Sequence, residues 1–125
     1  AGSGSVVNMS STAGIAGAPG AGAYCASKGA VRMLTKSAAL EAIATGFGIR
    51  VNSVHPAMTE TPMVQDIVQQ WGGDALIEEQ MRELQPSGRF IPVDAVVDAI
   101  RFLLSDQSRY LNGTELVVDN GFTAQ

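Results

Sequence analysis

Short runs of apolar, β-branched residues alternate with longer stretches of helix-forming residues along this chain of 125 residues. Residues 5–9, 49–54 and 115–118 have the composition of strands, and residues 23–44 and 93–104 have that of helices. Strands that alternate with helices predict an α/β fold in which parallel strands are joined by right-handed crossovers. No other feature of the sequence restricts the fold as much.

Glycine and proline mark where these elements are expected to end. They predict a loop over residues 14–22, a helix end at 46–48 and a stop to the second strand at 55–56. Residues 62–84 predict one helix or two, broken at 72–73. In the long helix, apolar residues recur at roughly helical spacing, at Val31, Leu34, Ala38 and Ile43.

Three strands make a poor free-standing parallel sheet, because both faces and both edges of such a sheet need cover. The first strand would have an open edge unless another strand lies beside it. The chain also begins at Ala1 without a methionine. We therefore expect one partial domain over residues 1–125, the C-terminal half of a doubly wound, Rossmann-like parallel sheet with its last three strands and their helices.

Charge and cysteine content exclude several classes of partner. The net charge is −4 and the pI is about 4.8, which argues against nucleic acid or an anionic membrane surface as a partner. Cys25 is the single cysteine, so no intrachain disulfide forms and a reducing cytoplasm is the simplest location. No apolar run reaches the ~18 residues that span a bilayer, the start does not resemble a signal peptide, and no metal site is predicted.

Tyr24 and Lys28 are four residues apart in a predicted helix, so their side chains are expected on one face. A free phenol has a pKa near ~10, too high for acid–base work at neutral pH. A lysine charge about 4 Å away favours the phenolate by roughly 4 kcal/mol at an effective dielectric of ~20, before desolvation costs. The pair could then exchange a proton with a substrate oxygen. The same spacing is common on ordinary helices, so alone it is weak evidence.

Ser10 and Ser11 follow the first strand, at the edge of a parallel sheet where ligands bind. A serine hydroxyl there can polarise a carbonyl or alcohol oxygen. The alternative is that such a serine only caps a turn. Ser11 precedes Tyr24 by 13 residues, with the glycine-rich loop between them.

Four segments in this order and spacing resemble the short-chain dehydrogenase/reductase family, and the resemblance covers nearly the whole chain. They are VVNMSSTAG at 6–14, AYCASKGAV at 23–31, IRVNSVHP at 49–56 and LNGTELVVDNG at 111–121. The chain looks closest to the bacterial ketone and secondary-alcohol dehydrogenases of that family, some of which share the tail Thr-Ala-Gln.

The resemblance implies an oxidoreductase that transfers a hydride between NAD or NADP and a carbonyl or secondary-alcohol substrate. Ser11 would polarise the substrate oxygen, and Tyr24 would be the general acid or base. Lys28 would lower the pKa of Tyr24 and, with it, hold the nicotinamide ribose. Ser10 fits less well, because its spacing to Tyr24 is one residue off. The cofactor-binding half and a fourth catalytic residue, an asparagine, would lie upstream of this sequence.

The resemblance also implies a nicotinamide contact after the second strand, formed by Pro56, Ala57, Met58, Thr59 and Thr61. Ala57 stands where the family usually has glycine, which puts tight packing against the cofactor in doubt. For Thr59, a role as helix cap before the following proline is an equal alternative.

Other residues have weaker signals. A structural role is expected for His55, and a packing role for Cys25. Asn120 replaces a family glycine, and asparagine tolerates the left-handed conformation there. Trp71 lies on the segment that covers the substrate in this family.

Two hypotheses remain open from the sequence. The first is the oxidoreductase, which in the family is a homotetramer or homodimer that packs through the long helix. We expect small residues at Gly29, Ala30 and 38–39 on the outward face of that helix. The second is a non-catalytic truncated fragment that serves only as a binding or oligomerisation module. The 125 residues alone are expected to be inactive. The choice between NAD and NADP, the substrate and the reaction direction are not determined.

Overall fold

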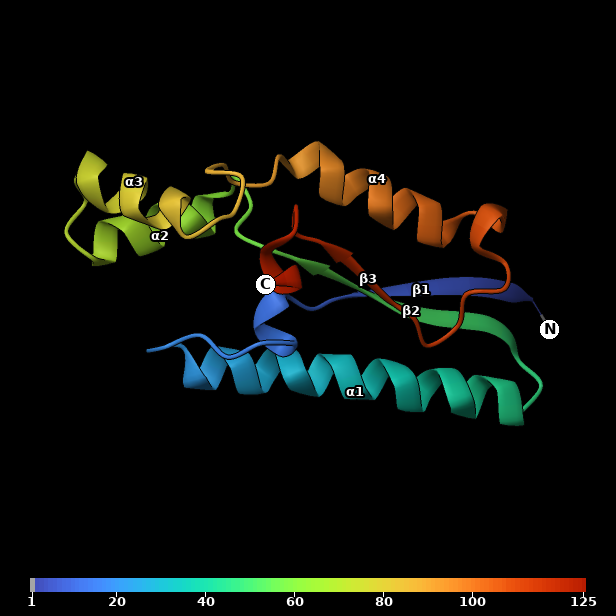
Figure 1. The fold of residues 1–125 in the computed structure, drawn as a ribbon. Coiled ribbons are helices and arrows are strands. Elements are labelled where there is room, and N and C mark those ends of the chain that lie inside the picture. Colours follow the sequence, from blue (N-terminus) through green and yellow to red (C-terminus); the bar gives the residue numbers. More distant parts are fainter. Residues whose placement is uncertain (1) are drawn as a thin grey trace.

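Three parallel strands form one sheet in the order β1-β2-β3 in the computed structural model, which describes residues 2–125 (Figure 1). The strands are β1 (Ser3–Met9), β2 (Gly48–Pro56) and β3 (Glu115–Val118). In the register of the central strand, Val6 lies opposite Val51 and Ser53 lies opposite Glu115. The predicted α/β architecture is confirmed.

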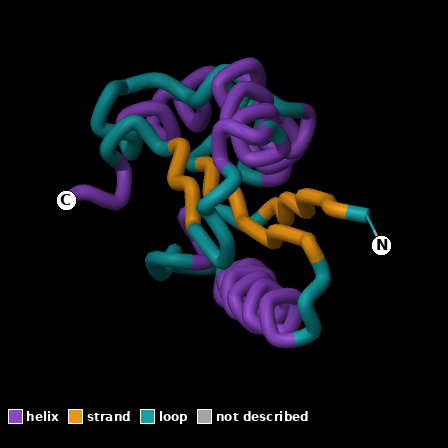
Figure 2. The backbone as a smooth tube through the Cα atoms, turned by 90° about the vertical axis from the view of Figure 1, so that its right-hand side faces the viewer, coloured by secondary structure: helices purple, strands orange, loops and turns teal. Residues whose placement is uncertain are grey.

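Helices cover both faces of the sheet. The long helix α1 (Gly22–Ala44) lies along one face and α4 (Val93–Leu104) along the other, as Figures 1 and 2 show. Two shorter helices, α2 (Pro62–Gln70) and α3 (Ala75–Glu83), lie beyond the carboxyl ends of the strands. Single 3₁₀ turns complete the chain: η1 (Thr12–Gly14), η2 (Asp106–Ser108) and η3 (Phe122–Ala124).

The apolar core lies between the sheet and α4. It is built from Val54, Ala57, Ile91, Val96 and Leu103. A second, smaller cluster holds α2 and α3 together, and consists of Val64, Val68, Met81 and Phe90. The helices α2, α3 and α4 each bury one apolar stripe, as amphipathic helices do.

The layer between the sheet and α1 is different, because the residues that α1 buries are small or polar. They are Thr35, Ala39 and Ala42, whereas Leu34 and Ile43 are exposed. A methyl group on Gly113 would lie only 3.4 Å from Cβ of Ala39, so the helix approaches the sheet closely there. The spacing of large apolar residues therefore predicted the helix but not its buried face. The assignment of Ala39 to an outward face was wrong, since it is 2% exposed against the sheet.

The predicted element ends are mostly correct. The second strand extends two residues beyond Val54, its predicted last residue, and includes His55 and Pro56. Pro56 ends the strand and needs no N–H there, and the ladder continues because Ala57 N donates to Val118 O (3.1 Å). The break at residues 72–73 is confirmed by two glycines with positive φ, and Asn120 adopts the expected left-handed conformation at φ 47°. None of the helices in the described chain is long and apolar enough to cross a membrane.

Candidate active site

Tyr24 and Lys28 lie in the first two turns of α1, beside the carboxyl end of β1. Lys28 Nζ is 5.6 Å from the centroid of the Tyr24 ring, so the two side chains share one face of the helix as predicted. The same Nζ donates a hydrogen bond to the main-chain oxygen of Met9 (3.1 Å). Tyr24 is 40% exposed, which leaves its phenol open to a ligand.

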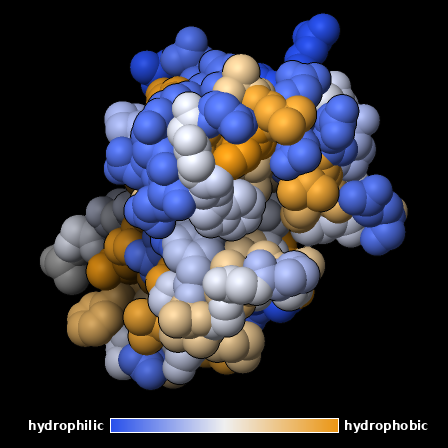
Figure 3. All heavy atoms as spheres, turned by 90° about the vertical axis from the view of Figure 1, so that its left-hand side faces the viewer, coloured by the Kyte–Doolittle hydropathy of each residue, from blue (hydrophilic) through white to orange (hydrophobic). Residues whose placement is uncertain are grey.

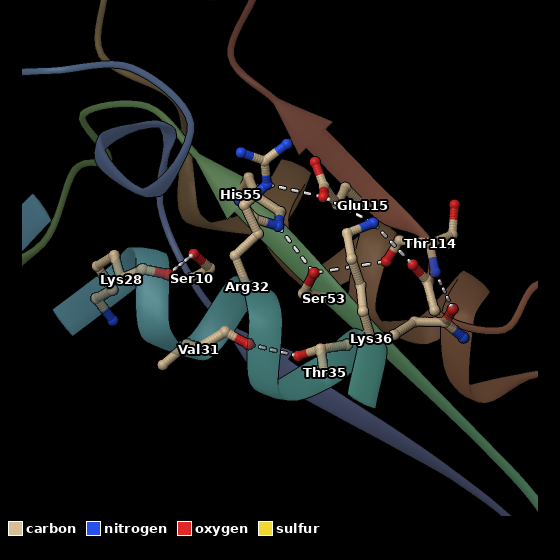
Figure 4. Close-up of polar contacts among 12 residues, drawn as sticks. Ser10, Lys28, Val31, Arg32, Thr35, Lys36, Ser53, His55, Thr114 and Glu115 are labelled. Carbon is tan, nitrogen blue, oxygen red and sulfur yellow. Dashed lines mark hydrogen bonds and ion pairs between the residues drawn. The ribbon is translucent and has the colours of Figure 1, made fainter. Parts of the chain in front are cut away.

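The loop after β1 is fastened to α1 at Lys28. The hydroxyl of Ser10, which is 4% exposed, donates to the main-chain oxygen of Lys28 (2.9 Å), as Figure 4 shows. A Cβ on Gly14 would lie 2.7 Å from that same oxygen, so only glycine permits this close approach. Ser10 and Gly14 thus fix the loop that carries Ser11. Their place in the segment at 6–14 is the only sign of this role in the sequence.

Ser11 directly follows Ser10 in this loop and is partly buried. Its Oγ accepts a hydrogen bond from Ala13 N (3.1 Å) and caps η1, so the capping alternative is part of what this serine does. Capping uses only an acceptor of the hydroxyl, and the proton remains free to donate. The nearest acceptor for that proton is the main-chain oxygen of Pro56, at 3.5 Å, a length that makes a weak bond.

His55 lies between Ser11 and the centre of the sheet and is fully buried. Its Nδ1 is 3.1 Å from the main-chain oxygen of Ser11, and its Nε2 is 2.8 Å from Oγ of Ser53. A carbonyl oxygen only accepts, so Nδ1 carries the proton and Nε2 accepts from the Ser53 hydroxyl. Burial lowers the pKa of His55 below its usual 6.5, which favours the neutral ring. A structural role for this histidine is confirmed.

The segment after β2 is held by its own main chain and by Ile91. Ile91 N donates to Met58 O (2.7 Å), and the methyl group of Ala57 belongs to the apolar core. The Ala57 methyl is therefore accommodated by the core.

Thr59 does not cap α2. Its hydroxyl donates to Ala57 O (3.0 Å), and the residue at the N-cap position is Thr61. The Thr61 side chain makes no capping bond either, since its hydroxyl donates to Thr59 O (3.3 Å). The capping alternative for Thr59 is wrong, because the helix begins two residues later than that alternative requires.

A charged cluster ties α1 to β3 at Glu115, which lies opposite Ser53 in the sheet. Glu115 accepts from Nε of Arg32 and Nζ of Lys36, each at 2.8 Å (Figure 4). The hydrogen bond from Arg32, with help from Lys36, lowers the pKa of Glu115 to about 2. Arg32 and Lys36 continue the helical row of Lys28 at intervals of four residues. That spacing is the only sign of the cluster in the sequence, and we did not predict it.

The carboxyl ends of β1 and β2 therefore hold most of the predicted site residues, at the edge where doubly wound α/β folds bind ligands. A family model described as enoyl-(acyl carrier protein) reductase matches residues 1–123. The chain belongs to the short-chain dehydrogenase/reductase family.

Relatives with known activities support this membership. The chain is 47% identical over 123 residues to a cyclopentanol dehydrogenase of Comamonas sp. (strain NCIMB 9872), a match that covers 97% of this chain and 46% of the relative. It is 40% identical over 121 residues to an NADP-dependent (R)-specific alcohol dehydrogenase of Lentilactobacillus kefiri, with 97% and 46% covered. The chain thus spans about half the length of the relatives it matches.

Solved structures agree. The crystal structure of levodione reductase superposes with a TM-score of 0.87 at 33% identity, covering 95% of this chain and 46% of that chain. The family and fold do not favour the hypothesis of a non-catalytic binding module.

Proposed function

We propose that the protein containing this chain is an NAD(P)-dependent oxidoreductase that interconverts a secondary alcohol and its ketone. The observation that carries the proposal is the Tyr24–Lys28 pair on one face of α1, fastened to the loop of Ser11, in a chain of this family. Residues 1–125 would form part of one Rossmann-like domain, whose cofactor-binding half lies outside this sequence.

In ketone reduction, Tyr24 would donate its phenolic proton to the carbonyl oxygen as that oxygen becomes an alkoxide. The Ser11 hydroxyl would donate a hydrogen bond to the same oxygen and stabilise its developing charge. The positive charge of Lys28 would favour the phenolate that remains on Tyr24. In alcohol oxidation the same groups act in reverse, with Tyr24 as the base.

The cofactor supplies or accepts the hydride. Pro56, Ala57, Met58, Thr59 and Thr61 would hold its nicotinamide end, together with Tyr24 and Lys28. The fit is supported by Ala57, whose methyl group packs into the core, and by the start of α2 at Thr61, which no side chain caps. The name of the Lentilactobacillus relative supports NADP, and NAD is the alternative.

The substrate class we favour is a small, largely apolar alcohol or ketone. A groove of about 360 Å³ between α2 and α3 is lined by Trp71, Ile77, Gln80, Met81 and Leu84. Figure 3, which looks onto this end of the molecule, shows hydrophobic side chains gathered among hydrophilic ones. An apolar surface at the carboxyl end of the sheet suits such a substrate, and the Comamonas relative supports cyclopentanol as a first compound to test.

The proposal includes a homo-oligomer that packs through α1, as a dimer or tetramer. Large apolar side chains lie exposed on this helix, at Met33, Leu34, Leu40 and Ile43, and such a stripe favours burial against a partner. A cytoplasmic location also remains a prediction.

The test is to assay the full-length protein with NAD and NADP against cyclopentanol and a panel of cyclic and acyclic secondary alcohols. Tyr24→Phe is expected to abolish turnover while the protein still binds the cofactor in a fluorescence titration, because Lys28 and the residues after β2 remain in place. Ser37→Ala, at an exposed position farther along α1, is the control and is expected to keep activity. If no compound is oxidised with either cofactor, the proposed function falls; if Tyr24→Phe remains active, the role of Tyr24 falls.

A further inference from the structure

The main-chain position of Ser11 depends on a side chain outside the predicted catalytic group. Ser10 N donates to Val54 O (2.9 Å), which continues the ladder between β1 and β2. One residue later the link to β2 is made by the His55 ring, whose Nδ1 lies 3.1 Å from Ser11 O. Gly14 N is the other donor to that oxygen (2.9 Å). The ring therefore joins the ends of two neighbouring strands at the residue that presents the catalytic hydroxyl.

The ring itself has little freedom to move. His55 is fully buried on the face of β2 that looks toward α1, and Ser53 holds the opposite nitrogen at 2.8 Å. With both nitrogens bonded, the ring is fixed in plane and in tautomer. The charged groups around it are Arg32 and Lys36 on α1 and Glu115 on β3, and both cations pair with Glu115 (Figure 4).

We infer that His55 is a positioning residue for the reaction. Through the hydrogen bonds that link Ser53, His55 and Ser11, it sets the main-chain orientation of Ser11 and thereby the direction of the Ser11 hydroxyl. This inference rests on the proposed function for its catalytic consequence. Ser11 has an extended conformation (φ −165°, ψ 163°) while its Oγ caps η1. Without the ring, only Gly14 N would hold the Ser11 carbonyl, and the peptide could rotate and redirect the side chain.

Three variants of the full-length protein test the inference. His55→Leu removes the donor to Ser11 O, whereas His55→Asn places an amide N–H close to the position of Nδ1. Ser53→Ala leaves that donor in place. We expect His55→Leu to lower kcat by about 10- to 100-fold, the size of effect that small misplacements of reacting groups produce. KM and cofactor affinity should change little, His55→Asn should recover most of the loss, and Ser53→Ala should stay within about threefold.

A double-mutant cycle separates positioning from general destabilisation. If His55 acts through Ser11, adding His55→Leu to Ser11→Ala should cost no further activity, because the hydroxyl to be positioned is gone. Two results would overturn the inference: activity losses from His55→Leu and Ser11→Ala that multiply, or equal activity losses in His55→Leu and His55→Asn. An inactive Tyr24→Phe variant would still support the proposed function in either case.

Nuclear magnetic resonance tests the inference even if no turnover can be measured or if His55→Leu does not fold. In ¹⁵N-histidine-labelled wild-type protein, His55 should show a protonated Nδ1 and an unprotonated Nε2. In protein labelled with ¹³C at the serine carbonyls, the Ser11 shift should move less in His55→Asn than in a foldable apolar variant such as His55→Phe. A protonated Nε2 with a free Nδ1 would overturn the inference whatever the activity.

Discussion

The attachment of α1 to β3 through Glu115 gives the most quantitative prediction, that Glu115→Gln destabilises the protein. Glu115 is the first residue of β3, and its side chain is 17% exposed between Arg32 Nε and Lys36 Nζ, each 2.8 Å from Oε1. Glutamine has nearly the same shape and still offers one oxygen, but it lacks the negative charge. The substitution therefore isolates the charge from the packing.

The magnitude follows from the pKa of this carboxyl. The two cations lower the pKa of Glu115 from 4.5 to about 2, which corresponds to at most ~3 kcal/mol. Arg32 and Lys36 are 34% and 38% exposed, so water screens part of that interaction, and we expect a loss of about 1–2 kcal/mol at neutral pH. Because the folded-state pKa is lowered, the stabilisation is present above pH 4.5 and is lost as the pH falls toward 2.

Urea unfolding of full-length wild type and variant measures the difference. The free energies of unfolding should differ most near neutral pH and approach one another as the pH falls from about 5 toward 2. Over this range the unfolded wild type takes up a proton at Glu115, whereas the folded protein keeps the charge until the pH nears 2. Glu79→Gln on the exposed side of α3 is the control, since Glu79 forms no ion pair within residues 2–125. A difference below about 0.3 kcal/mol at neutral pH, or one that does not change with pH, would refute the reasoning.

Two further predictions concern the loop of Ser11. Gly14→Ala should cost about 1–3 kcal/mol of stability and lower activity, because the new methyl group would lie 2.7 Å from the main-chain oxygen of Lys28. Thermal unfolding and an activity assay measure these two effects. The control is Gly17→Ala, which should be neutral because a methyl group there meets nothing within 4 Å. For His55, the lowered pKa means that the unfolded chain takes up a proton below pH 6.5 when the folded chain does not. Wild type should therefore lose more stability than His55→Asn between about pH 7.5 and about pH 5.5 in urea titrations, and parallel curves would contradict the burial of a neutral ring.

Local patterns were sufficient to predict the strands and helices. The last strand and α4 have the predicted bounds, because β-branched runs and an amphipathic repeat report directly on the strand and helix periods. The buried face of α1 was not predictable in this way. Its large aliphatic residues Leu34 and Ile43 are exposed, and the helix is buried through Thr35 and Ala39, so a rule that equates large apolar residues with the core points to the wrong side.

The site could be predicted only in part, for a related reason. Tyr24 and Lys28 are close in sequence, so helical spacing alone places them together. The partners of His55 are 2 and 44 residues away, and the partners of Glu115 are about 80 residues away. Such contacts depend on strand order and register, which single segments do not contain.

The two faces of the sheet are also stabilised by different kinds of interaction. Toward α4, contact is apolar and centred on Val54 and Leu103, and apolar contact is strong but non-directional. Toward α1, the connections are hydrogen bonds and ion pairs between defined atoms: Asn8 Nδ2 to Thr35 Oγ1 (3.0 Å), Ser10 Oγ to Lys28 O (2.9 Å), and the Glu115 pair.

Directional bonds restrict the rotation and the sliding of a helix more tightly than an apolar seam does, because a small displacement breaks them. α1 carries Tyr24 and Lys28, whereas Ser11 belongs to the loop after β1, so the proposed proton transfer requires that the helix and the strand keep a fixed relative position. A polar layer on this side of the sheet meets that requirement, and it explains why α1 is buried through small and polar residues while α4 is buried through large apolar ones.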